Sequence, residues 1–148
     1  MSFQEHKDFA EALRSYFVEH LPADLLPVKG GSFSLDGLSD NNSAPSMSLQ
    51  ITGSQTLRTY IDGTRIEDLH FTLLYRAPID RNNAAKSAML GTLNGIGTWL
   101  DGQEPPYLGE DFRISKLEQR QAANVVTQTA NSITYQAGFV LGYETQGR

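Results

Sequence analysis

The sequence predicts an α+β domain: a mainly antiparallel sheet with two helices packed on it. Two stretches carry apolar residues at helical spacing, several others alternate apolar and polar residues, and turn-forming residues separate them. The alternating stretches are grouped between and after the helical ones, an order that favours hairpins over parallel crossovers. With 148 residues, 39% of them hydrophobic, the chain is predicted to form one domain over residues 1–148.

The first helix is predicted over residues 3–20. Its apolar residues recur every four positions, with charged residues on the other faces. The apolar set is Phe9, Leu13 and Phe17. Ser2 and Glu5 have the spacing of a capping box at its start, and the helix is predicted to end before Pro22.

The first strands are predicted around two turn-rich segments. Residues 32–38 predict a short strand, and residues 39–45 predict an exposed loop. The next strand alternates, with the apolar residues Met47, Leu49 and Ile51. Residues 53–55 are predicted to turn the chain into another strand over residues 56–61. Asp62-Gly63 then predicts a type I′ hairpin turn, because glycine tolerates the positive φ that this turn requires.

A long strand and a second helix are predicted after this hairpin. The strand has one apolar face and stops at Pro78. That face carries Leu69, Phe71, Leu73 and Tyr75. The helix is capped by Asp80 or Asn82 and ends before Gly102. Its apolar residues at helical spacing are Ala85, Met89, Leu93, Ile96 and Leu100.

Three glycines fall inside this second helix: Gly91, Gly95 and Gly97. Each weakens a helix by roughly 1 kcal/mol relative to alanine. We therefore predict that they permit close approach to the sheet or to a neighbouring subunit.

The remaining strands follow a rigid loop. Residues 113–117 and 124–128 predict two strands around a polar segment. The final strand alternates over a long run, so one of its faces is predicted to be buried. Its apolar residues are Ile133, Tyr135, Ala137, Phe139, Leu141 and Tyr143.

Charge and composition exclude several functional classes. Lys and Arg number 12 against 17 Asp and Glu, giving a net charge of -5 without a basic run, which argues against sequence-specific nucleic-acid binding. The absence of cysteine excludes disulfides and thiolate metal sites. No signal peptide or membrane-length apolar window is found, so we expect a protein made in the cytoplasm and not associated with a membrane.

The search for catalytic chemistry finds one group, Glu67, Asp68 and His70. On a strand, Asp68 and His70 share a face, so the carboxylate could orient the imidazole as a general base. No activated nucleophile accompanies them, and the sequence has neither a phosphate-binding loop nor histidines at metal-ligand spacing. We therefore predict no enzyme, no catalytic residues, no cofactor and no metal.

Three segments together resemble the small minor capsid or tail-terminator proteins of long-tailed phages: residues 68–77, Thr98-Trp-Leu100 and residues 133–143. The likeness extends from the first helix to the last strand. The glycine-rich middle of the second helix and the loop at residues 39–45 depart from the pattern of that family.

The resemblance implies a single tail-terminator-like domain that assembles as a homo-oligomeric ring, usually a hexamer. Such a ring caps the tube of the major tail protein at the head-proximal end of the tail in the virion and joins it to the head connector protein. Genome DNA passes through the lumen without specific binding, which suits an acidic protein. Rings of this kind have no catalytic residues.

Polar projections are the interface candidates in such a subunit, because they can reach a neighbouring protein. They are Asp40, Asn41, Asn42 and Ser43 in the loop, Asp62 and Gly63 in the hairpin turn, and His70 on a strand surface. The alternatives are another head–tail connector or a tail-tube protein. A further alternative is a small α+β ligand-binding module or enzyme that uses the face of Asp68 and His70.

Overall fold

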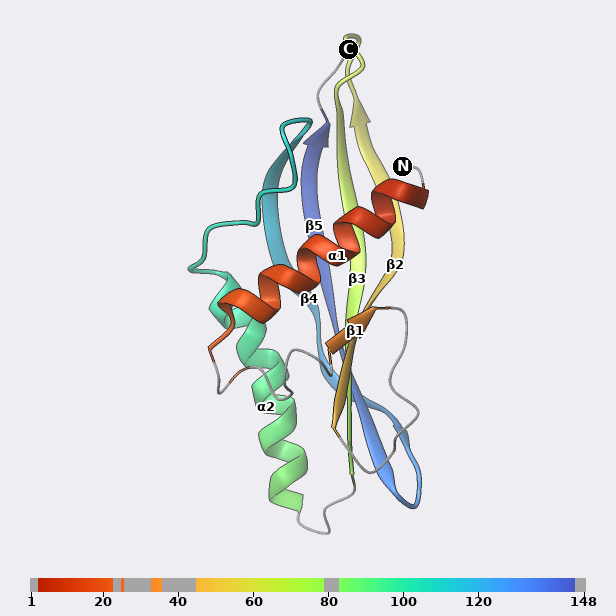
Figure 1. Ribbon diagram of the computed structural model, residues 1–148, viewed down its shortest axis with the longest axis vertical. Coiled ribbons are helices and arrows are strands. Elements are labelled where there is room, and N and C mark those ends of the chain that lie inside the picture. Colours follow the sequence, from red (N-terminus) through yellow and green to blue (C-terminus); the bar gives the residue numbers. More distant parts are fainter. Residues whose placement is uncertain (1–2, 23–24, 26–32, 36–44, 79–82, 146–148) are drawn as a thin grey trace.

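The chain forms two helices and one sheet, which confirms the α+β class (Figure 1). The computed structural model describes residues 3–22, 25, 33–35, 45–78 and 83–145, without the side chains of residues 3–7 and 83–87. Within them the elements are α1 (Phe3–His20), β1 (Phe33–Leu35), β2 (Ser46–Thr59), β3 (Arg65–Pro78), α2 (Asn83–Leu100), β4 (Phe112–Gln128) and β5 (Ser132–Thr145). None of the described helices has the length and apolar character needed to cross a membrane.

The sheet has the strand order β1-β2-β3-β5-β4. β1 is parallel to β2, and the other neighbouring pairs are antiparallel, as the sequence predicts for most of the sheet. β3 and β5 pair without a register shift, from Arg65 opposite Thr145 to Pro78 opposite Ser132. Their partners β2 and β4 both contain register shifts. The regular centre of the sheet is therefore the β3–β5 pair.

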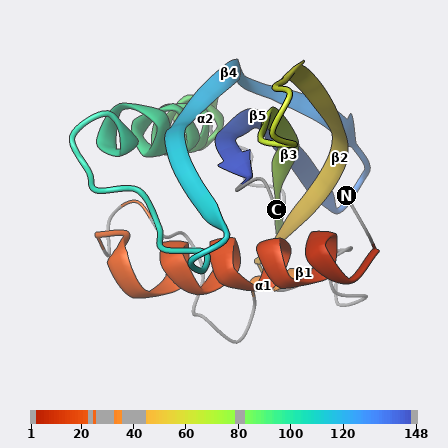
Figure 2. The ribbon, with the colours of Figure 1, turned by 90° about the horizontal axis from the view of Figure 1, so that it is seen from above.

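The core lies between α1 and the apolar face of β3 and β5. Helix α1 runs diagonally across the strands and spans the open side of the curved sheet (Figures 1 and 2). The Phe17 ring centroid lies 6.2 Å from that of Phe71 and 6.4 Å from that of Phe139. Phe71 and Phe139 are opposite each other on β3 and β5 and stack at 5.4 Å. All three rings are buried, so this cluster fixes α1 on the sheet.

Helix α2 lies beside β4 (Figure 2) and is tied to it by one amide side chain. The Asn94 Oδ1 atom accepts a hydrogen bond from Gln119 Nε2 at 2.9 Å and another from the Ala123 backbone N–H at 2.8 Å. A Cβ atom at Gly97 would lie 2.8 Å from Gln119 Cβ, closer than real Cβ contacts. Gly97 therefore permits close approach to the sheet, as predicted. A Cβ at Gly95 would instead lie 2.9 Å from Leu25 Cδ2, outside the sheet, and a Cβ at Gly91 would meet open space.

Two predicted interruptions of the strands are wrong. Residues 53–55 do not turn the chain, because β2 runs from Ser46 to Thr59 and takes up a register shift between Ile51 and Gly53. Residues 113–117 and 124–128 belong to one strand, β4, whose polar middle contains two register shifts. Bulges let a strand absorb extra residues while it stays paired with its neighbour.

The predicted hairpin turn is correct in place and wrong in type. The Tyr60 N–H donates to the Thr64 carbonyl at 2.8 Å, and the Gly63 N–H donates to the Tyr60 carbonyl at 3.0 Å. These bonds enclose a three-residue loop, 61–63, instead of a two-residue type I′ turn. Gly63 occupies the position with positive φ, 89°, as this loop type requires.

The strand predicted over residues 56–61 ends earlier, at Thr59, and the other predicted boundaries agree where the structure describes them. α1 covers residues 3–20, β1 falls inside residues 32–38, and β3 stops at Pro78. Ser2, residues 39–44, Asp80 and Asn82 lie outside the described residues, so the predicted caps and the polar loop stay predictions.

The glycines of α2 give a matched test of this packing. Gly91→Ala should raise the free energy of unfolding by about 0.5–1 kcal/mol, because alanine favours the helix and meets no neighbour. Gly97→Ala should instead lower it by about 1–3 kcal/mol, because the added methyl group displaces Gln119 from Asn94. Urea denaturation measures both. Equal effects of the two substitutions would contradict the close approach of α2 to β4.

Candidate functional site

The tip of the β2–β3 hairpin projects beyond the core (Figure 1). Residues 54–63 are all exposed, although β2 begins in the core. Among them are three large apolar side chains, Leu57, Tyr60 and Ile61, which are 50%, 42% and 108% exposed. We call residues 57–65 the hairpin tip. Clustered exposed apolar side chains are typical of a surface that binds another molecule.

The hairpin tip also carries charge. The Arg58 guanidinium lies 5.9 Å from the centre of the Tyr60 ring, within the range of a cation–π contact. The Asp62 carboxylate accepts a hydrogen bond from the Thr64 N–H at 2.9 Å, and this bond lowers the pKa of Asp62. The Asp62 carboxylate is thus directed to the backbone of the turn. The tip therefore offers a partner apolar side chains and the Arg58 guanidinium.

The base of the hairpin is held to β5 by a buried carboxylate, Glu67. Its Oε2 atom accepts a hydrogen bond from the Tyr143 hydroxyl at 2.6 Å. Its Oε1 atom accepts one from the Thr56 hydroxyl at 3.1 Å and lies 3.7 Å from the Arg65 guanidinium. Breaking such a network would leave a buried carboxylate without compensation. These bonds therefore fix the position from which the tip projects.

The opposite face of the sheet carries Asp68 and His70, which do share a face, as predicted. Asp68, Gly142 and Lys116 lie in one row across β3, β5 and β4. The Lys116 Nζ atom lies 3.6 Å from Asp68 Oδ1, and its stem crosses Gly142, where a Cβ would be 2.7 Å from Lys116 Cγ. The ion partner of Asp68 is therefore Lys116. Glu67, the third member of the sequence group, points to the core face.

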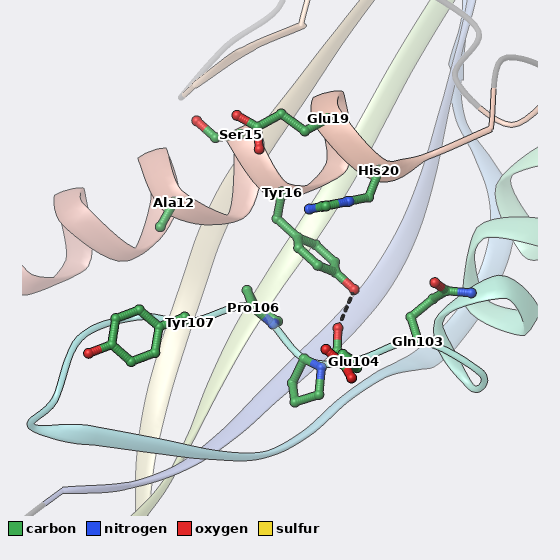
Figure 3. Close-up of a pocket in the computed structure, with 10 residues that line it drawn as sticks. Ala12, Ser15, Tyr16, Glu19, His20, Gln103, Glu104, Pro106 and Tyr107 are labelled. Atoms are coloured by element: carbon green, nitrogen blue, oxygen red, sulfur yellow. Dashed lines mark hydrogen bonds between the residues drawn. The ribbon is translucent and has the colours of Figure 1, made fainter.

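A second candidate surface is a pocket of about 600 Å³ between α1 and the segment that follows α2 (Figure 3). Its lining is Ala12, Ser15, Tyr16, Glu19 and His20 from α1, and Gln103, Glu104, Pro105, Pro106 and Tyr107 from the other wall. We call it the α1 pocket. The Tyr16 hydroxyl donates to the Glu104 carbonyl oxygen at 2.8 Å and joins the two walls.

The α1 pocket has aromatic, prolyl and acidic walls. The His20 ring lies 5.0 Å from the Tyr16 ring, and Tyr107 is 78% exposed at the opposite wall. Glu19 and Glu104 add two carboxylates. Burial, and secondly the charge of Glu104, raises the pKa of Tyr16 above its usual value. This lining suits an apolar side chain that is accompanied by a cation.

The predicted interface residues fall in three places. Asp62 and Gly63 form part of the hairpin tip, and His70 is half-buried on the opposite sheet face. Residues 40–43 lie outside the described residues. Sequence reasoning missed the apolar part of the tip and the whole α1 pocket. Ile61 next to the Asp-Gly turn was the available signal for the tip.

No group of three His, Asp or Glu side chains within the described residues is arranged to hold a metal ion.

The comparisons with known proteins identify a similar fold. No family model matches the chain, and no curated protein matches it. A solved chain from the virion of a native gene transfer agent particle is similar in structure, with a TM-score of 0.54 and 15% sequence identity. The match covers 91% of this chain and 96% of that chain. At this identity, the likeness establishes a shared fold over nearly the whole length of both chains.

The raised pKa of Tyr16 predicts a loss of stability in alkaline solution. The neutral phenol is favoured in the folded state, so its contribution is fully present below a pH of about 10 and is lost as the pH rises through the raised pKa. Tyr16→Phe should cost about 1 kcal/mol at pH 8, because the bond to the Glu104 carbonyl is lost.

Between pH 8 and pH 11, this variant should then lose less stability than the original chain. Urea denaturation at both pH values measures the difference. The other tyrosines are the same in both proteins, so an equal loss in the two would contradict the burial of the Tyr16 hydroxyl.

Proposed function

We propose that this protein is a structural component of a phage or phage-like virion, and that it acts as a tail terminator. The observation that carries the proposal is the fold, which is shared with a chain of a gene transfer agent virion over 91% of this protein. The resemblance of three sequence segments to tail-terminator proteins gives the finer assignment. The proposal assigns no catalytic activity to the chain.

In the proposed role, copies of the chain form a closed ring, a hexamer by analogy with the family. The ring caps the tube of the major tail protein and binds the head connector protein on its other side. A cyclic ring requires two different surfaces on each subunit, because the contacts run head to tail: each copy binds one neighbour with its first surface and the other neighbour with its second. The hairpin tip and the α1 pocket are two such surfaces, and they lie on different elements.

Charge supports the passage of DNA through such a ring. The net charge of -5 gives the phosphate backbone little to bind, so DNA can slide without being retained. Two positively charged side chains of β4 are paired with carboxylates of the same chain: Lys116 with Asp68, and Arg120 with Glu118 at 2.8 Å.

The position of the protein in the particle tests this proposal. We expect gold-labelled antibodies against the chain to mark one site per particle, where the tail meets the head. Antibodies against the major tail protein serve as the control, because they should mark the tail along its length. Label along the whole tube would make the chain a tube protein, and absence of the chain from purified particles would contradict a virion role.

A further inference from the structure

We propose that the hairpin tip of one copy binds in the α1 pocket of a second copy of this chain. This contact deepens the proposed function, since it would supply the head-to-tail interface of the ring. The two surfaces match in apolar character and in charge, and each match rests on described residues.

The apolar match centres on Ile61. Its side chain is 108% exposed at the end of the hairpin, and two further apolar side chains of the same tip, Leu57 and Tyr60, are 50% and 42% exposed. The α1 pocket has a volume of about 600 Å³, within the range that encloses a small ligand or a few side chains. Pro105, Pro106 and the rings of Tyr16 and Tyr107 provide its apolar walls. Inserting Ile61 there removes apolar surface from water on both copies.

The charge match pairs arginine with glutamate. Arg58 lies on the hairpin tip, whereas Glu19 and Glu104 line the pocket. The other arginine of the tip, Arg65, is paired with Glu67 of its own chain. The acidic residue of the tip, Asp62, is turned to its own backbone by the bond from Thr64. Complementary charges around an apolar contact select the partner and fix the orientation of binding.

The placement of the two surfaces makes the contact directional. The hairpin tip is at the end of the sheet where β5 finishes, with Arg65 opposite Thr145 (Figure 1). The α1 pocket is lined by residues between Ala12 and His20, in the C-terminal half of α1. Each copy therefore offers a tip to one neighbour and a pocket to another. Such a head-to-tail contact closes into a ring when the rotation between copies permits it.

The absence of cysteine from the chain makes a disulfide test unambiguous. An Ile61→Cys variant is mixed with a Tyr107→Cys variant at high protein concentration under mild oxidation. We expect a disulfide-linked dimer that joins positions 61 and 107, identified by mass spectrometry of its peptides. The matched control mixes Ile61→Cys with Val126→Cys, a residue of β4 that is 49% exposed, and should give little linked dimer.

A charge exchange tests the orientation. Arg58→Glu in the tip partner should lower the yield of the 61–107 link about fivefold, as expected for the loss of one exposed ion pair. Adding Glu104→Arg to the pocket partner should restore it. This second substitution keeps the backbone carbonyl that accepts the Tyr16 hydrogen bond. Restoration supports direct contact between these two positions.

Three results would overturn the proposed contact. They are equal linking of positions 61–107 and 61–126, links only between two copies of the Ile61→Cys variant, and the absence of any link. The test uses the isolated protein, so it is independent of the localisation in particles. A specific 61–107 link in a protein absent from virions would refute the tail-terminator role and leave the contact standing. Localisation at the head–tail junction without the 61–107 link would support the tail-terminator role and refute the proposed contact.

Discussion

The unshifted pairing of β3 with β5 is the constraint on which the rest of the structure depends. Because every residue of β3 keeps its partner on β5, the alternating apolar side chains from Leu69 to Tyr75 and from Ile133 to Tyr143 stay on one face. That face receives α1 through Phe17, which contacts both Phe71 and Phe139. The same register places Tyr143 opposite Glu67, so it also anchors the projecting hairpin. The packing of the core and the position of the hairpin tip thus both depend on the register between β3 and β5.

The central elements could be predicted from sequence because their patterns are strong. Alternation locates β3 and β5, and the spacing from Phe9 to Phe17 locates α1. The outer strands were broken in the prediction at Gly53 and at the polar middle of β4, since these residues have turn-forming or polar character. In the structure both segments stay in strands because a regular neighbour supplies hydrogen bonds across the bulges. The local sequence of these segments does not indicate which strand will pair with them, so this pairing could not be predicted from it.

The candidate site was predictable only in part, for a related reason. The Asp62-Gly63 turn has a local signature, but the exposure of Ile61 depends on how far the hairpin extends beyond α1. The α1 pocket requires α1 and the segment after α2 to meet, and Tyr16 and Glu104 are 88 positions apart in the chain. The pair of Asp68 with Lys116 likewise depends on Gly142 of an intervening strand. Such groupings arise only after the sheet has formed.

The central pair of strands is also the least local in the chain. β2 with β3, and β4 with β5, are joined by short turns, whereas α2 and β4 separate β3 from β5 along the sequence. Bringing β3 to β5 therefore closes a long loop. The entropic cost of this closure grows only slowly with loop length, but the chain loses this entropy before the stabilising contacts between the strands have formed. Non-local pairing of this kind slows folding much more than it weakens the native state. The β3–β5 pairing, which forms the regular centre of the sheet, is thus also the pairing expected to limit the folding rate.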